Sequence, residues 1–164
     1  MEDVEKFGEL IKDIKFVMFI TRYNGSTGLH SRPMTLQDIE FDGDLWFFTS
    51  KRSQLAHEIE SSPEVCLAFS DNKDFTFVSA EGHAEIVTGD KEKERELWRE
   101  PYKAWFAEGV DDPDLCLIKV EIHAADYWDS PSSKLVRMAK FAKAMVAPGR
   151  DNNALGERGR IDLN

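Results

Sequence analysis

The chain has 164 residues, a formal net charge of −10 and an apolar fraction of 41%, and it contains eleven Phe. This composition excludes a mainly disordered protein, and the length suits one domain with a substantial core. The acidic balance disfavours non-specific binding to nucleic acid, since a phosphate backbone attracts basic surfaces. No stretch approaches the ~20 apolar residues of a membrane span, and the charged start does not have the pattern of a signal peptide. We therefore expect a cytoplasmic protein with neither a membrane nor a nucleic acid as partner.

Apolar residues near the start of the chain are spaced as on one face of a helix, which predicts an amphipathic helix over residues 2–14. The next segment, 15–23, is short, aromatic and β-branched, as is typical of a buried strand. Asn24-Gly25 predicts a tight turn, after which residues 26–34 return as the paired strand.

A second hairpin is predicted around Asp42-Gly43, between strands at 39–41 and 45–49. The later elements predicted, in chain order, are a helix at 54–61, strands at 65–70 and 75–87, a helix at 90–106 that Asp90 caps and Pro101 divides, a strand at 115–123 and a helix at 133–146. The polar end of the chain, about 148–164, is expected to be weakly held.

About six strands with short turns, few helices and no βαβ alternation predict a mainly β fold. We expect a small antiparallel β-barrel with flanking helices, formed by a single domain over residues 1–164. A doubly wound α/β fold would need helices between successive strands, and the sequence does not place them there.

The clearest candidate for a binding site lies where an aromatic strand runs directly into a helix. Leu45-Trp-Phe-Phe48 continues into Thr49-Ser-Lys-Arg-Ser-Gln54, which brings hydroxyls and two cations to the start of the helix. Helix N-termini present unpaired N–H donors and a partial positive charge, so this junction suits a phosphate group. The flat side chains beside it suit a planar ring, and together they predict a phosphorylated aromatic cofactor. Helix capping by the same hydroxyls is the simpler alternative.

Other chemistries have no support in the sequence. The four histidines show no metal-ligand spacing, so no metal site is expected. Cys66 and Cys116 lie in separate apolar runs, which is typical of buried free thiols. No GxSxG, P-loop or GxGxxG motif is present, which argues against a hydrolase, a nucleotide triphosphatase or a Rossmann domain.

Four short segments follow one another along the chain in an order that matches a known family: Ser31-Arg-Pro-Met34, Trp46-Phe-Phe-Thr-Ser50, Ser53-Gln-Leu-Ala56 and Tyr127-Trp-Asp-Ser-Pro131. Their order and spacing resemble the flavin-binding split barrels related to pyridoxamine 5′-phosphate oxidase, and in particular the general stress protein 26-like branch. The resemblance covers most of the chain. It implies a split antiparallel β-barrel of the FMN-binding type, a homodimer, and FMN bound at the dimer interface.

The resemblance also implies which residues contact the cofactor. Arg32 would approach the flavin phosphate or the ring edge, Phe48-Thr49 would contact the cofactor, and Ser53 would bind the phosphate beside a nearby cation. Trp128 would reach the flavin from the partner chain. The residues expected at the cofactor are Arg32, Pro33, Met34, Phe48, Thr49, Ser50, Lys51, Ser53, Gln54, Trp128 and Arg137.

Departures from the family pattern bear on the reaction. The positions where the oxidase has an Arg and a His for its substrate read approximately Lys134 and Val136, and the Arg-rich C-terminal signature is missing. The resemblance thus argues against vitamin B6 oxidation. We expect an FMN-dependent oxidoreductase linked to the stress response, with a reduced nicotinamide as electron donor and no catalytic residue assigned. The alternatives are a flavin-binding stress or sensor protein without turnover, and a binder of the deazaflavin F420 or of haem.

Overall fold

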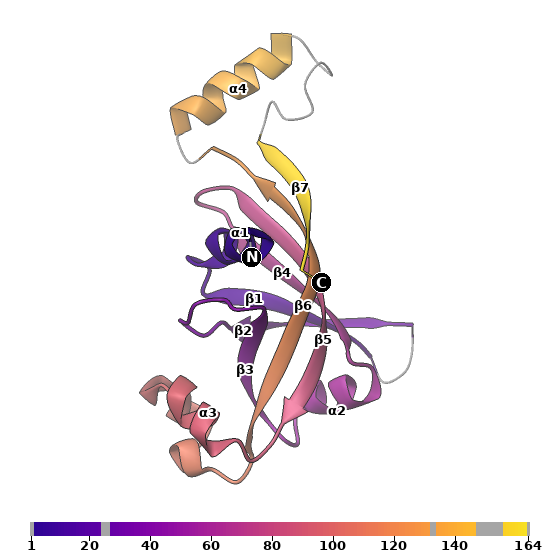
Figure 1. The fold of residues 1–164 in the computed structure, drawn as a ribbon, viewed down its shortest axis with the longest axis vertical. Coiled ribbons are helices and arrows are strands. Elements are labelled where there is room, and N and C mark those ends of the chain that lie inside the picture. The colour runs from indigo at the N-terminus through magenta and orange to yellow at the C-terminus, as the bar shows by residue number, and fades with distance from the viewer. Residues whose placement is uncertain (1, 24–26, 132–133, 147–155, 164) are drawn as a thin grey trace.

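The computed structural model describes residues 2–23, 27–131, 134–146 and 156–163, in which seven strands form one antiparallel sheet (Figure 1). The strands are β1 (Phe16–Arg22), β2 (Leu29–Thr35), β3 (Asp44–Ser50), β4 (Glu64–Asp71), β5 (Thr76–Val87), β6 (Leu115–Asp129) and β7 (Glu157–Asp162). The helices are α1 (Glu2–Ile11), α2 (Gln54–Ser61), α3 (Lys91–Leu97), α4 (Lys134–Val146) and the short 3₁₀ helices η1 (Glu100–Ala104) and η2 (Gly109–Asp111).

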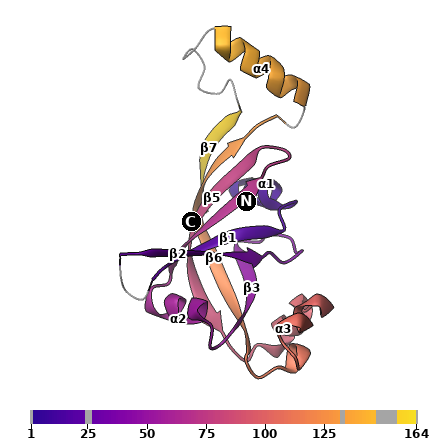
Figure 2. The ribbon, with the colours of Figure 1, turned by 180° about the vertical axis from the view of Figure 1, so that it is seen from behind.

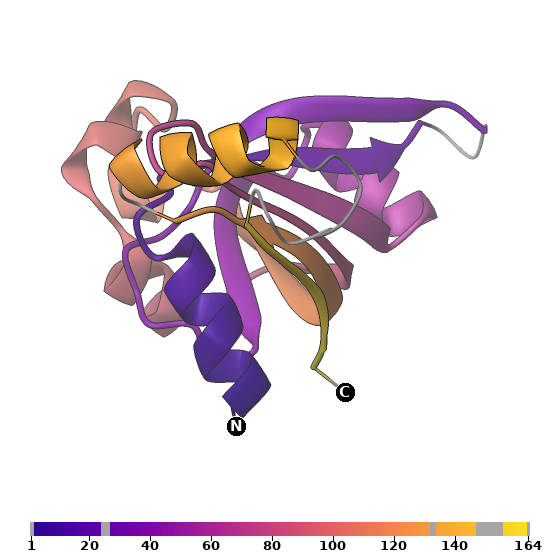
Figure 3. The same ribbon diagram turned by 90° about the horizontal axis from the view of Figure 1, so that it is seen from above.

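The sheet curls into a half-closed barrel, as seen from above in Figure 3. Its strands pair in the order β2-β1-β4-β5-β6-β3, and β3 and β7 pair with successive parts of β6. The predicted mainly β fold, a split antiparallel barrel with flanking helices, is therefore confirmed. Helix α4 projects beyond one end of the sheet and α3 lies at the other end (Figures 1 and 2). Among the described helices, none combines the length and apolar composition needed to cross a bilayer.

The core follows from strand alternation and from the apolar face of α1. In β1, Val17 and Phe19 point into the barrel while their neighbours point outward. Phe7 of α1 packs against Phe41 and Phe69, with ring centroids 4.7 and 5.8 Å apart. Full burial of such a side chain contributes roughly 1.5–3 kcal/mol, so α1 contributes to the stability of the barrel as well as covering it.

The predicted hairpin around Asp42-Gly43 is wrong. Residues 39–41 form no strand, and β3 pairs with β6, so that Leu45 lies opposite Val120. The physical reason is the packing of Phe41 against α1, which draws this segment away from the edge of the sheet. The contact between Phe41 and α1, which are distant in sequence, therefore outweighs the local preference for a hairpin turn.

The last strands also extend further than the sequence suggested. Strand β6 continues to Asp129 and not only to residue 123 as predicted, so Trp128 lies on the strand. Residues 157–162 form β7, which corrects the expectation of a weakly held end for this part of the chain; positions 147–155 lie outside the described residues. Ile161 is buried in the core and Arg160 pairs with Glu81 at 2.6 Å, so packing and charge both hold β7 in place.

The predicted charged helix is shorter than expected. Asp90 caps α3 by accepting a hydrogen bond from the Lys93 backbone N–H at 3.0 Å, as predicted. The helix ends at Leu97, and Pro101 lies in the first turn of η1, because proline is compatible with a helix start but not with a helix interior. The predicted helices at 54–61 and 133–146 correspond to α2 and α4.

Candidate functional site

The junction between β3 and α2 brings two predicted hydroxyls together. The Thr49 and Ser53 hydroxyl oxygens lie 2.9 Å apart, and the Ser53 hydroxyl accepts a hydrogen bond from the Ala56 backbone N–H at 3.0 Å. Ser53 therefore caps α2, which agrees with the simpler alternative, helix capping by these hydroxyls. The cap uses one of the N–H groups that a helix leaves unpaired in its first turn, and the others remain suited to an anion.

A buried carboxylate lies one turn further along α2. Glu58 has no exposed surface, and it accepts hydrogen bonds from Arg32 at 2.5 Å, Thr21 at 2.6 Å and Gln54 at 2.8 Å. His30 Nδ1 lies 3.0 Å from the second carboxylate oxygen, Oε1. This cluster ties β1, β2 and α2 together at a single side chain.

The cluster decides how Arg32 can act. Its guanidinium also donates to the Thr21 hydroxyl at 2.8 Å, and its side chain is only 17% exposed. Burial opposes ionisation of Glu58, but hydrogen bonds from Thr21, His30 and Arg32, with the charge of Arg32, outweigh it and hold the pKa of Glu58 below its usual range. The positive charge of Arg32 is thus compensated inside the protein.

Glu58 was not among the residues predicted from the sequence, although the sequence contains a signal for it. Glu58 lies on the face of α2 that also carries Leu55 and Ile59, at the spacing of the buried side of a helix. A charged residue on an apolar helix face implies a buried partner, because an unpaired buried charge is strongly destabilising. Arg32, already singled out, was the available partner.

The cations at the junction differ in their partners. Asp114, which was also not predicted, accepts hydrogen bonds from the Ser50 hydroxyl and from Arg52 Nε, the latter at 3.1 Å. The Ser50 hydrogen bond, followed by the contact with Arg52, holds the pKa of Asp114 below its usual range. Among the described residues, Lys51 forms no side-chain ion pair and is exposed, so it is the cation available to a ligand.

The remaining residues predicted on β2 and β3 face different ways. Phe48 lies on the face opposite Thr49, against Trp98 and Tyr102, with ring centroids 5.8 and 5.4 Å away. Met34 packs against the core, whereas Pro33 is exposed. The Thr49 and Ser53 hydroxyls therefore lie together at the junction, and Gln54 and Arg32 both bind Glu58 one turn further along α2. Phe48 and Pro33 belong to neither group.

Trp128 and Arg137 are not brought to this junction within one copy of the chain. Thr49 pairs with Cys116 on β6, and Trp128 lies 12 positions along that strand, which at about 3.3 Å per residue is roughly 40 Å. There the Trp128 ring contacts the Arg158 guanidinium at 5.4 Å. Arg137, on α4, lies 4.8 Å from the ring of Phe75.

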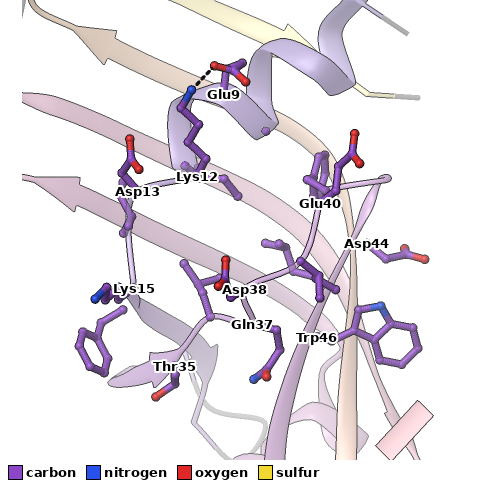
Figure 4. Close-up of a pocket in the computed structure, with 18 of the residues that line it drawn as sticks. Glu9, Lys12, Asp13, Lys15, Thr35, Gln37, Asp38, Glu40, Asp44 and Trp46 are labelled. Carbon is purple, nitrogen blue, oxygen red and sulfur yellow. Dashed lines mark hydrogen bonds and ion pairs between the residues drawn. The ribbon is translucent and has the colours of Figure 1, made fainter. Parts of the chain in front are cut away.

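The structure adds a cavity that the sequence did not predict. It has a volume of about 760 Å³ and lies between the end of α1, the connection from β2 to β3, and the start of β3 (Figure 4). None of the residues predicted to contact the cofactor lines it.

Two further observations bear on the chemistry. Cys66 and Cys116 are both free, and burial raises the pKa of the Cys116 thiol to about 11, so this thiol is poorly reactive. In the part of the chain that the structure describes, no three His, Cys, Asp or Glu side chains are placed to hold a metal ion.

A curled antiparallel sheet of seven strands with flanking helices is the architecture of a split β-barrel. The model of the pyridoxamine 5′-phosphate oxidase-like family matches residues 2–152, and the chain belongs to this family. No curated protein matches the sequence.

Solved structures agree with this assignment. The general stress FMN/FAD-binding protein of Xanthomonas citri is 32% identical, with a TM-score of 0.67 over 80% of this chain and 92% of its own. A general stress family protein of Xanthomonas campestris is 33% identical, with a TM-score of 0.67 over 80% of this chain and 90% of its own. A general stress protein 26 of Jannaschia has the same fold, with a TM-score of 0.77 and 24% identity over 99% of this chain and 100% of its own.

Proposed function

We propose that this protein binds FMN at the interface of a homodimer in the cytoplasm and uses it as an oxidoreductase linked to the stress response. The observation that carries the proposal is the β3–α2 junction, where the Thr49 and Ser53 hydroxyls lie 2.9 Å apart at a helix N-terminus. Support also comes from the similarity to the Xanthomonas citri protein, which is described as binding FMN or FAD.

In this proposal the phosphate lies at the first turn of α2. Ser53 and the free N–H groups of that turn would bind it, and Lys51 would supply the charge because Arg32 is compensated by Glu58. Arg32 would then act chiefly by holding β2 against α2, where Met34 would lie close to the ring. FMN, when bound, would accept a hydride from a reduced nicotinamide and pass electrons to a small acceptor.

A second copy would complete the site. Trp128 lies roughly 40 Å along β6 from the residue that pairs with Thr49, which is too far for both to contact one flavin within a single chain. A homodimer that places the partner's β6 end and α4 beside the junction would bring an aromatic ring and a cation to the flavin. This is the reason for including the dimer in the proposal.

A flavin-binding protein without turnover is the second candidate. Two separate ion pairs favour it. Arg32 pairs with Glu58, and Arg52 pairs with Asp114. Neither of these two carboxylates is therefore free to act as a base toward a substrate at the junction.

The first test is titration of the purified protein with FMN, riboflavin and F420, followed by absorbance. We expect FMN to bind more tightly than riboflavin, and Lys51→Ala to weaken FMN several-fold while leaving riboflavin unchanged. Lys103→Ala, at another exposed lysine, is the matched control. Absence of any flavin uptake would refute the proposal. Bleaching of the bound flavin by NADH or NADPH, with reoxidation by an added acceptor, separates the oxidoreductase from the protein without turnover.

A further inference from the structure

His30 contacts the buried Glu58 but has no role in the proposed function. It lies on β2, two positions before Arg32, and its Nδ1 is 3.0 Å from Glu58 Oε1. The His30 side chain is 39% exposed, whereas Arg32 is 17% exposed and Glu58 is fully buried. Of the three charged or titratable side chains in this cluster, His30 is therefore the most open to solvent.

Nδ1 of His30 lies between a hydrogen-bond donor and an acceptor. Arg32 Nη2, which can only donate, is 2.6 Å away, and the carboxylate oxygen Glu58 Oε1 is 3.0 Å away. A neutral ring with its hydrogen on Nε2 accepts from Arg32 at Nδ1, whereas a protonated ring donates from Nδ1 to Glu58. Each form finds a partner inside the protein, so protonation exchanges one contact for the other.

Protonation also changes the charge of the cluster. With a neutral His30, one cation, Arg32, faces one anion, Glu58, and the two charges cancel. With a protonated His30, two cations share the same carboxylate, and one positive charge is left over. The other titratable side chain described in contact with His30 is Tyr23, with ring centroids 5.9 Å apart, and a tyrosine ordinarily carries no charge at neutral pH.

The additional charge would lie beside the first turn of α2. Gln54, the first residue of the helix, donates to Glu58 Oε1 at 2.8 Å, and the same oxygen contacts His30 Nδ1. His30 is therefore close to the residue that follows Ser53, where the proposed function places the phosphate. Physiological salt, with a Debye length of roughly 8 Å, screens charges of such neighbouring groups only partly.

We propose that protonation of His30 raises the affinity of the β3–α2 junction for the phosphate group of its ligand. This inference rests on the proposed function and adds to it a regulation of the same site by pH. Lys51 would supply a constant positive charge and His30 a conditional one. Because binding linkage is reciprocal, a bound phosphate would favour the protonated form of His30 to the same extent.

The test is the number of protons that the protein takes up on binding FMN at about pH 7.5, measured by calorimetry in buffers of different ionisation enthalpy. We expect the wild type to take up a measurable fraction of a proton with FMN and none with riboflavin, which lacks the phosphate. A phosphate at a cationic site itself releases protons, so net uptake has to come from the protein. His30→Gln should abolish the uptake, and at about pH 6.5 it should weaken FMN by about fivefold or more and leave riboflavin unchanged.

Two other histidines provide the controls. His83→Gln removes an exposed histidine that also lies near a carboxylate, with Nδ1 3.9 Å from Glu64, and it should leave the proton uptake unchanged. His57 is the alternative source of protons at α2, since its Nδ1 lies 2.8 Å from the Ser53 carbonyl oxygen. Loss of uptake in His57→Gln and not in His30→Gln would overturn the proposal, as would equal uptake in the wild type and all three variants.

A measurement on the wild type alone gives a second test, although His30→Gln should fold because Glu58 keeps Arg32, Thr21 and Gln54 as donors. Sulfate should move the His30 ring signals in NMR at pH 7 toward those of the protonated ring, relative to chloride at equal ionic strength. Signals that respond to neither sulfate nor FMN overturn the proposal and leave FMN binding itself intact. If no flavin binds but sulfate still protonates His30, the proposed function fails and the pH-dependent anion site stands.

Discussion

The buried ion pair between Glu58 and Arg32 makes a sharp prediction about stability. Glu58→Ala removes the acceptor for Arg32, Thr21 and Gln54, and it leaves the guanidinium with 17% exposure and no counter-ion. Breaking a buried pair by removing one partner costs roughly 3–5 kcal/mol of folding free energy. For a chain of this length about 2–4 °C is lost per kcal/mol, so the melting temperature should fall by about 6–20 °C.

Two further variants separate the origins of this loss. Glu58→Gln keeps the volume and part of the hydrogen bonding, so its cost should be smaller, about 1.5–3 kcal/mol, as for a hydrogen bond to a charged group. Glu60→Ala, on the same helix but exposed, is the matched control and should change stability little. Chemical unfolding in urea, fitted for the free energy and for the slope, gives all three values.

The pH dependence gives an independent check with a defined sign. The pKa of Glu58 is lower in the folded protein than in the unfolded chain, so the folded state favours the ionised form. Its stabilising contribution is complete above the unfolded pKa of about 4.3 and is lost as the pH falls through the folded value. The stability difference between the wild type and Glu58→Gln should therefore shrink as the pH falls below about 5, through the unfolded pKa and then through the lower folded pKa.

A Glu58→Ala variant as stable as Glu60→Ala at pH 7 would contradict a stabilising role for the buried ion pair. A double-mutant cycle with Arg32→Ala sharpens this test, because the coupling energy isolates the pair from the loss of packing. Additive losses would mean that the two side chains stabilise the protein separately.

Three further predictions concern other parts of the molecule. Ser53→Ala removes the α2 cap and should cost about 1 kcal/mol in urea unfolding; an unchanged midpoint would contradict the capping role. Gly82→Ala would press a Cβ against the Glu121 backbone carbonyl oxygen of β6 and should cost about 1–3 kcal/mol, whereas Gly8→Ala, with only an ordinary contact at 3.5 Å, should be neutral or stabilising. A thiol reagent at pH 8 should modify Cys66 and spare the buried Cys116, whose pKa is about 11, until the protein is unfolded; modification of both in the native state would contradict this.

The two strand-forming regions at the start of the chain show how far local patterns reach. An aromatic, β-branched run followed by turn residues predicts β1 and β2, because both strands are close in sequence, and their antiparallel pairing is consistent with this. The predicted turn itself, Asn24-Gly25, lies outside the described residues. The same signals fail for β3, whose partner β6 begins more than sixty residues later and is selected by packing. A local turn motif carries no information about such a partner.

The candidate site divides in the same way. The hydroxyls and cations of residues 49–54 were predictable, since they follow one strand and begin one helix in sequence. The neutralisation of the Arg32 charge was not predictable from the sequence. Glu58, which pairs with Arg32, lies on α2, and Thr21, which accepts a hydrogen bond from it, lies on β1.

Composition, periodicity and motif order thus determined the mainly β class, most helices and the location of the junction between β3 and α2. The tertiary structure decided the pairing of β3, the place of Trp128 on a strand remote from the junction, and the burial of Glu58. The physical reason is that local patterns report each segment's own preferences. Strand partners and buried ion pairs depend instead on which distant surfaces come together to exclude water.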